Sequence, residues 1–352
     1  MSAFELALED RLVESATGSL ELLSIHLGRS LGLYAILREP NTAADLALEA
    51  GIDLRYAREW LEQQATADFI TVDDPALLWG QRRYSLSERQ VRVLLTPDDP
   101  IHVAPLADMI AAVAAVVPAV AAAYRRGSGV AYSDYGKAFR DGQAGINRPA
   151  FTHSLVQEWV PESVPAIHMR LNKGGLLADL GCGAGWSTVA LTRGYPNSAV
   201  IGYDSDASSI EDAKRNALAT GLEVDFRIAD ASQIAEDGPF DLILILEALH
   251  DMSNPVEVLA QARLALAPDG AVLVADEQVA SSFTAPGDML ERMMYAWSVL
   301  ACLPSARVET PSAAIGTVLR EPLLREMAQE AGFDSVEVPD VDAGFFRLYV
   351  LR

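Results

Sequence analysis

Short apolar runs alternate with helical stretches through the second half of the chain. Residues 176–180, 199–204 and 240–246 are almost wholly apolar, which is typical of strands buried on both faces of a sheet. The stretches at 186–192 and 210–219, which follow the first two runs, have the spacing of helices. Strands and helices that alternate in this way predict an α/β protein with a doubly wound sheet.

The end of the chain completes the same pattern. A glutamate-rich helix is predicted over 322–331, where Gly332 ends it. Two apolar strands at 335–340 and 344–351 follow, and a tight turn joins them. We expect these two strands to close the sheet.

The first part of the chain has a mainly helical pattern. An amphipathic run over 13–37 precedes a helix-turn-helix pattern in which Thr42 can cap a short helix and Gly51 makes the turn. Asp53 can then cap a second helix, predicted to run through Phe69.

Residues 83–91 are predicted to form the returning strand of a wing, so that the first unit resembles a winged helix. A mostly helical connector follows, with an exposed, glycine-containing insert over 129–151. Its most apolar stretch, 109–124, is short for a bilayer and interrupted by Pro118, which favours a buried or dimer-facing helix over a membrane span. The chain thus divides into three predicted parts, 1–100, 101–165 and 166–352.

A glycine-rich turn joins the first strand of the α/β part to its helix. Asp179 is followed by Gly181, Gly183 and Gly185 in the pattern D-x-G-x-G-x-G. Glycines at such a turn let the backbone approach a nucleotide-like ligand closely. The turn that holds NAD has the spacing G-x-G-x-x-G, and Trp186 stands here where that turn needs its last glycine. The turn therefore argues against a nicotinamide-dependent oxidoreductase.

Acidic residues follow three further strands, at the edge where open α/β sheets bind ligands. Asp204 ends one strand, and its carboxylate can accept hydrogen bonds from both hydroxyls of a ribose. Asp230 with Ala231 ends the next strand, and Glu247 follows the third. An aspartate at such a position can instead cap the following helix, as we expect of Asp206.

The glycine turn and the acidic strand ends together resemble class I methyltransferases that use S-adenosylmethionine (SAM). This resemblance implies a Rossmann-like sheet of seven strands, with SAM as cofactor and S-adenosylhomocysteine as product. It places the glycine turn at the methionine end of SAM, Asp204 at the ribose, Asp230 at the adenine amino group and Glu247 beside the transferable methyl group. In the insert, Tyr135 and Arg148 can meet the carboxylate of SAM; alternatively, Tyr135 packs and Arg148 forms a surface ion pair.

The segment around His250, EALHDMSNPVEVL, resembles the HDWSD segment of small-molecule O-methyltransferases, with Met252 where that family usually has tryptophan. In that family the histidine is the general base. Histidine titrates near neutrality and can take the proton of a phenol or alcohol, while Asp251 or Glu277 could stabilise the imidazolium. Alternatively, His250 only shapes the loop before a helix that Asn254 caps.

Residues 278–319 contain a methionine-rich and aromatic run at helical spacing, which is predicted to cover the acceptor site. Met293, Met294, Tyr295 and Trp297 would line a pocket for a small aromatic or apolar acceptor. Packing in the core would explain such a stripe equally well.

The charge of the chain narrows the range of partners. The formal net charge is -22 with only three lysines, so the surface repels nucleic acid and anionic membranes. The first hundred residues are also acidic, which favours the dimerisation role that such a unit has in small-molecule O-methyltransferases over the basic face of a DNA reader.

The remaining composition excludes several classes of site. The two cysteines, Cys182 and Cys302, form no disulfide framework or zinc pattern, and no acids and histidines have metal-ligand spacing. No signal peptide opens the sequence, so we expect a cytoplasmic protein. The sequence predicts a homodimeric, metal-independent methyltransferase that uses SAM. The predicted substrate is a small acceptor, and the predicted methylated atom is oxygen. The alternative is a winged-helix transcriptional regulator that senses SAM.

Overall fold

The computed structural model describes residues 7–352 and divides into two compact units. One unit comprises the chain up to Ala114 together with Asp141–Pro149, and the other comprises Ala115–Arg140 with Ala150–Arg352. The residues predicted as a connector, 101–165, are therefore shared between both units.

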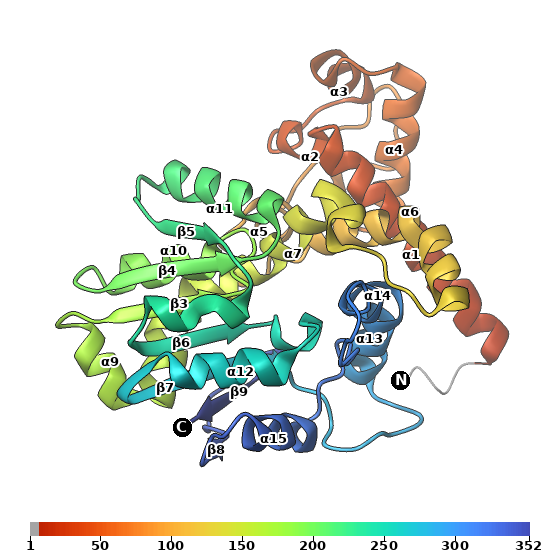
Figure 1. The fold of residues 1–352 in the computed structure, drawn as a ribbon. Helices are drawn as coiled ribbons and strands as arrows, with labels where there is room; N and C mark the ends of the chain where they lie inside the picture. The colour runs from red at the N-terminus through yellow and green to blue at the C-terminus, as the bar shows by residue number, and fades with distance from the viewer. Residues whose placement is uncertain (1–6) are drawn as a thin grey trace. The chain divides into compact units, whose positions relative to one another are not determined.

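The N-terminal unit is mainly helical, with one small hairpin (Figure 1, red to orange). Its elements are α1 (Leu8–Ser30), α2 (Leu33–Ile36), α3 (Ala43–Ala50), α4 (Leu54–Thr66), β1 (Thr71–Val72), β2 (Tyr84–Ser85) and α5 (Glu88–Leu95). β1 and β2 pair antiparallel. The helix-turn-helix pattern and a following hairpin are therefore both present in this unit.

The predicted signals at the helix ends are confirmed. Thr42 accepts from the backbone N–H of Asp45 in a capping box, Gly51 ends α3 in the left-handed conformation, and Asp53 caps α4. The predicted strand over 83–91 is confirmed only at β2. Ser87 caps α5 instead, so the end of that segment, from Glu88 on, is helical.

Two long helices, α6 (Pro105–Arg126) and α7 (Gly136–Ala150), replace most of the predicted connector. The expected interruption at Pro118 is wrong, because α6 continues through it. Among residues 7–352, α6 is the one helix long and apolar enough to cross a bilayer. The glycine-containing insert is also not an exposed loop, since it holds the short helix η1 (Tyr132–Tyr135) and α7.

The larger unit contains a seven-stranded sheet in the order β5-β4-β3-β6-β7-β9-β8. Its strands are β3 (Leu176–Leu180), β4 (Ala199–Asp204), β5 (Asp225–Ile228), β6 (Phe240–Leu246), β7 (Leu266–Glu277), β8 (Val336–Glu337) and β9 (Phe346–Leu351). β3 to β7 are parallel, and β9 runs antiparallel to both of its neighbours. The predicted α/β fold with a doubly wound, seven-stranded sheet is confirmed.

Helices cover both faces of this sheet. The helices that follow α7 in the chain are η2 (Phe151–Trp159), α8 (Val160–Ser163), α9 (Pro165–Leu171), α10 (Trp186–Gly194), α11 (Ala207–Thr220), η3 (Ala231–Asp237), η4 (Leu249–Asp251), α12 (Pro255–Leu264), α13 (Met289–Trp297), η5 (Ser298–Cys302), α14 (Leu303–Ala306) and α15 (Glu321–Glu330). The predicted helix over 322–331 is confirmed as α15.

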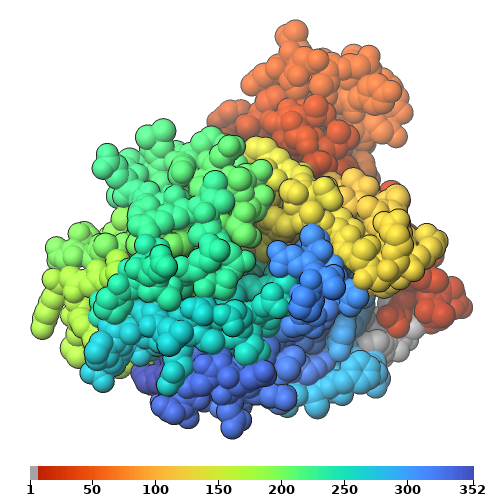
Figure 2. Space-filling view, in the orientation of Figure 1, coloured from red at the N-terminus to blue at the C-terminus, as the bar shows by residue number. Residues whose placement is uncertain are grey.

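The core of the larger unit follows from the alternation of side chains along β6. Ile243 and Ile245 pack with α12 and α15 on one face, whereas Leu242 and Leu244 pack with α9 and α10 on the other (Figure 1). Figure 2 shows α12 and α15, in teal and blue, side by side on the surface of this unit. All four side chains are fully buried, and burial of each contributes about 1.5–3 kcal/mol. This packing fixes the carboxyl ends of the parallel strands at one edge.

Candidate functional site

The three glycines of the turn after β3 have different surroundings. Gly181, Gly183 and Gly185 all have positive φ, at +70, +51 and +78°. A Cβ at Gly181 would lie 2.6 Å from the Cβ of Ala248, and one at Gly185 would lie 2.7 Å from the ring of Phe226. Gly183 has no atom within 4 Å of that position. Two glycines therefore permit close packing, and Gly183 presents bare backbone to open space, as a cofactor site requires.

Asp179 lies beneath this turn and is almost fully buried. Its Oδ2 accepts hydrogen bonds from the hydroxyls of Ser187 and Thr188, each at 2.6 Å, which attaches the first turn of α10 to β3. Burial raises the pKa of Asp179 despite these two bonds. Its visible role is to hold the glycine turn in place.

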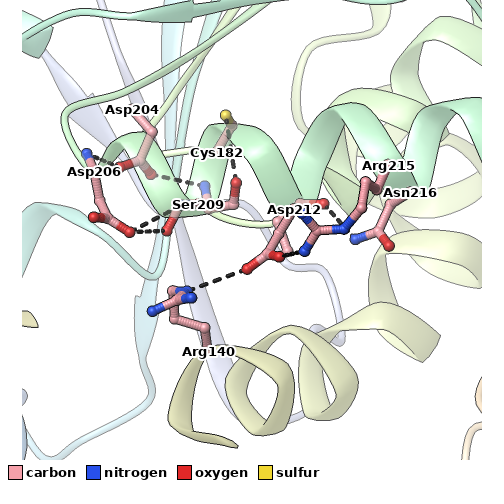
Figure 3. A network of polar contacts seen from close by, with 10 residues as sticks. Arg140, Cys182, Asp204, Asp206, Ser209, Asp212, Arg215 and Asn216 are labelled. Carbon is pink, nitrogen blue, oxygen red and sulfur yellow. Dashed lines mark hydrogen bonds and ion pairs between the residues drawn. The ribbon is translucent and has the colours of Figure 1, made fainter. Parts of the chain in front are cut away.

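Asp204, at the end of β4, faces the glycine turn. Its Oδ2 accepts the backbone N–H of Gly183 and its Oδ1 accepts that of Asp206, both at 2.8 Å (Figure 3). Burial raises the pKa of Asp204 to about 6, although the backbone N–H groups oppose the shift. Each oxygen has a further lone pair, so the carboxylate can accept hydrogen bonds from two more donors.

Three predicted positions at the neighbouring strand ends behave differently from one another. Asp230 caps η3, because its Oδ1 accepts from the backbone N–H of Ser232 at 2.8 Å and from the Ser232 hydroxyl. Ala231 begins that short helix. Glu247 directly follows β6 with φ at +53°, a conformation rare for residues other than glycine, and its N–H donates to the carbonyl of Ala275. Asp206 caps α11, as expected.

His250 is the centre of a buried acidic cluster at the same edge. Its Nδ1 lies 3.0 and 3.1 Å from the two carboxylate oxygens of Asp276, and 3.4 Å from Oε2 of Glu277. Nε2 lies 3.6 Å from Oδ1 of Asp251. His250, Asp276 and Glu277 are each at most 3% exposed. The structure thus brings both predicted acids to His250 and adds a third.

The three carboxylates control the charge of the imidazole. Burial by itself lowers the pKa of His250, but Asp276, Glu277 and Asp251 outweigh it and raise the pKa well above its usual range. Burial also raises the pKa of Glu277 well above the usual range of a glutamate. The ring therefore holds a proton firmly once it has taken one.

Asp276 is the residue that the sequence analysis missed. It makes the shortest contact with His250, whereas we expected Asp251 or Glu277 to do so. The available signal was two adjacent acids at the end of an otherwise apolar strand. A further expectation is wrong: Asn254 stands at the N-cap of α12, but its side chain makes no capping hydrogen bond.

Tyr135 and Arg148 have partners other than the predicted ones. The Tyr135 hydroxyl donates to the carbonyl of Leu300 at 2.8 Å, and the tyrosine is buried. Arg148 donates to both oxygens of Asp98, at 2.6 and 2.8 Å, within the N-terminal unit. The structure therefore does not support their contact with a cofactor carboxylate and agrees with the alternative.

Tyr132, three residues before Tyr135, has its hydroxyl in the electrostatic environment of the site. Burial, followed by the charges of Asp204, Asp251 and Glu247, raises its pKa well above the usual range. Its ring packs 5.8 Å from that of Phe139. The sequence analysis did not single out Tyr132, although it lies in the same glycine-containing segment as Tyr135.

The predicted pocket residues separate into two groups. Met294 is buried, whereas Tyr295 is exposed and its hydroxyl accepts from Arg320 at 3.2 Å. Met293 and Trp297 are partly buried, and the Trp297 ring lies 6.4 Å from that of Phe139. The aromatic group of Tyr132, Phe139 and Trp297 is thus continuous, and Tyr295 points away from it.

An ion pair joins the first part of α7 to α11 within the larger unit. Asp212 of α11 is buried, accepts from Nε of Arg140 at 3.1 Å and also pairs with Arg215 (Figure 3). The next residue, Ala213, packs against Gly185. Arg140 therefore anchors the chain that carries Tyr132 beside the glycine turn.

Acids and a histidine that lack metal-ligand spacing along the chain come together in the fold. Two groups around His250 place their donor atoms within 4.8 Å of one another, namely His250 with Asp276 and Glu277, and His250 with Asp251 and Cys302. These residues are far apart in sequence, which is why spacing along the chain does not reveal them.

Comparisons with known proteins indicate the family of the α/β part of the chain. Residues 171–338 match the family model described as a methyltransferase domain. The chain is 35% identical over 106 residues to a ubiquinone biosynthesis O-methyltransferase from a Caulobacter species, a match that covers 29% of this chain and 41% of that protein. The chain thus spans about two fifths of the length of such curated relatives.

Solved structures match the fold over nearly the whole chain. An O-methyltransferase family protein from Burkholderia thailandensis has a TM-score of 0.72 at 16% identity, covering 99% of this chain and 98% of that one. Human N-acetylserotonin methyltransferase, solved in complex with SAM, has a TM-score of 0.67 at 18% identity, covering 99% and 98%. Residues 171–338 therefore match a methyltransferase domain, and the chain has the fold of class I methyltransferases.

Proposed function

We propose that the protein transfers the methyl group of SAM to an oxygen atom of a small aromatic or apolar acceptor, with His250 as general base. The observation that carries this proposal is the buried contact between His250 Nδ1 and Asp276 at the carboxyl edge of the sheet. The names of the O-methyltransferases reported above support the same reaction class.

The contact with Asp276 determines what the imidazole can do. In the deprotonated ring, whose fraction grows as the pH rises toward the raised pKa of His250, a carboxylate that accepts from Nδ1–H leaves the lone pair on Nε2. That lone pair can take the proton of an acceptor hydroxyl. Bound SAM supplies an already activated methyl group, so this chain's residues need to orient the acceptor and remove its proton. Asp276 and Glu277 then stabilise the imidazolium that results.

The reaction can be tested in two steps. Isothermal titration with S-adenosylhomocysteine should show micromolar or tighter binding, with no response to NAD. A panel of phenols and alcohols should then be incubated with SAM and followed by mass spectrometry for the gain of one methyl group. Methylation of amines alone, with no oxygen acceptor, would contradict the assignment of the acceptor atom.

We propose Asp276 as a positioning residue, and Asp276→Asn tests this role. The amide can donate to Nδ1 and so place the imidazole proton on Nε2, where it blocks base catalysis. We expect kcat to fall about a hundredfold or more with the KM for SAM unchanged, within the range for general-base catalysis. An equal loss of SAM affinity would indicate a structural role instead.

We also propose a homodimer that forms through the N-terminal unit. α1 exposes a stripe of large apolar side chains at helical spacing, formed by Leu12, Leu20, Leu23, Leu27 and Leu31. Leu20 and Leu27 are 69% and 51% exposed, so a charge at these positions does not disturb the core of the chain. A second copy would cover this stripe.

The double variant Leu20→Asp/Leu27→Asp tests the dimer. Light scattering should give about twice 37.8 kDa for the wild type and 37.8 kDa for the variant. Leu218→Asp is a matched control, since Leu218 is 79% exposed on α11 in the other unit, and it should leave the mass unchanged. If the double variant kept the wild-type mass, α1 would not be part of the dimer interface.

A further inference from the structure

The Nε2 side of His250 carries a second set of donor atoms, which the proposed reaction does not use. Asp251 and His250 belong to η4, and Cys302 is the last residue of η5, yet their donor atoms lie within 4.8 Å of one another. Nε2 is 3.6 Å from Oδ1 of Asp251. η5 is a π-helical turn inserted between α13 and α14, a feature common at functional sites.

The chemistry of these three donors is that of a zinc site. Imidazole nitrogen, thiolate sulfur and carboxylate oxygen are the ligands that Zn²⁺ takes in tetrahedral sites, and three protein ligands leave one position open. A nitrogen and an oxygen bound to one tetrahedral ion lie roughly 3.4 Å apart, close to the separation between Nε2 and Asp251. A carboxylate on the other ring nitrogen, here Asp276, is the usual second support of a metal-bound histidine.

Two buried oxygen atoms independently point to a missing cation. Oδ1 of Asp251 and Oε2 of Glu277 are both buried without a hydrogen-bond donor among the described residues, and Glu277 as a whole is 3% exposed. Three carboxyl groups surround one imidazole, so a single imidazolium does not balance all the negative charge that the cluster can carry. Buried excess charge of this kind is normally balanced by a partner ion.

We propose that His250, Asp251 and Cys302 bind a thiophilic divalent cation of the Zn²⁺ class, and that this ion inhibits methyl transfer. When the ion binds, the Cys302 thiol gives its proton to solvent. The sulfur, Nε2 of His250 and Oδ1 of Asp251 then each donate a lone pair to the ion. Nε2 has one lone pair, so an occupied site cannot also take the proton of an acceptor. The inhibitory part rests on the proposed function, whereas ion binding does not.

Cobalt absorption tests the site without any turnover. Co²⁺ added to chelator-treated, full-length protein should give a thiolate-to-cobalt charge-transfer band in the near ultraviolet and saturate at one ion per chain. Cys302→Ser should lose this band, and Cys182→Ser, which changes the only other cysteine, should keep it. Circular dichroism establishes that both variants are folded. A band that persists in Cys302→Ser, or no band in the wild type, would overturn the proposal.

Zinc inhibition separates this inference from the proposed function. Once an acceptor is known, Zn²⁺ should inhibit turnover by the wild type, and a chelator should restore it. Cys302→Ser should keep basal turnover. Inhibition of this variant should need at least about tenfold more Zn²⁺, as expected for a site that loses one of three ligands. Stimulation by Zn²⁺ would overturn the inhibitory part. A cobalt band in a protein that methylates no acceptor would support the site and contradict the proposed function.

Discussion

His250→Ala is expected to lower kcat by about 10²- to 10⁴-fold, the usual contribution of a general base. The variant removes the group that takes the acceptor proton. Affinity for SAM should stay near that of the wild type, because the glycine turn and Asp204 do not contact His250. Turnover and calorimetry on the same preparation measure both effects.

His168→Ala is the matched control for this variant. His168 lies in α9, ahead of β3, and bonds the Tyr195 hydroxyl at 2.9 Å. It is thus near the opposite end of the strands, and its loss should leave kcat unchanged. Because His250 is buried among acids, thermal melts should accompany the kinetics. A folded His250→Ala variant that methylates a phenol at the wild-type rate would remove His250 from the mechanism.

Asp204→Ala should weaken SAM binding by about 10²- to 10⁴-fold. Each hydrogen bond to a charged group contributes about 1.5–3 kcal/mol, and the carboxylate can accept two from the ribose. The variant also frees the N–H groups of Gly183 and Asp206, which loosens the glycine turn. Calorimetry with S-adenosylhomocysteine measures the change in affinity.

Asp206→Ala is the control for that variant. Asp206 is close in sequence but caps α11, so its loss should lower stability by about 1 kcal/mol and leave SAM affinity near that of the wild type. If both alanine variants bound S-adenosylhomocysteine normally, Asp204 would have no part in the site.

The pH dependence of binding gives a further test of Asp204. Its pKa is raised to about 6 by burial, so the carboxyl is increasingly protonated below that pH. The protonated form loses acceptor capacity toward the ribose hydroxyls, and SAM affinity should fall by up to about tenfold for each pH unit below 6. Asp204→Asn should show weaker binding that does not change between pH 5 and 7, since an amide does not titrate there.

The sequence determined the sheet of the larger unit almost completely. A strand buried on both faces must be apolar throughout, so the runs that became β3, β4 and β6 were visible without any tertiary information. Capping residues such as Thr42 and Asp53 act within a few residues of their own position, so their role could also be predicted from the sequence. The glycine turn and Asp204 were found for the same reason, because the order of strands along the chain places them at one edge.

Only the tertiary structure decided which polar side chains meet. Asp276 and Glu277 are adjacent acids, and the packing of β7 beside β6 is what brings Asp276 closest to His250. Arg148 pairs with Asp98, fifty positions earlier, and Cys302 reaches His250 through a π-helical turn. Such contacts depend on side-chain direction and on distances across the fold. Local periodicity records neither of these, because it reports only which face of an element is buried.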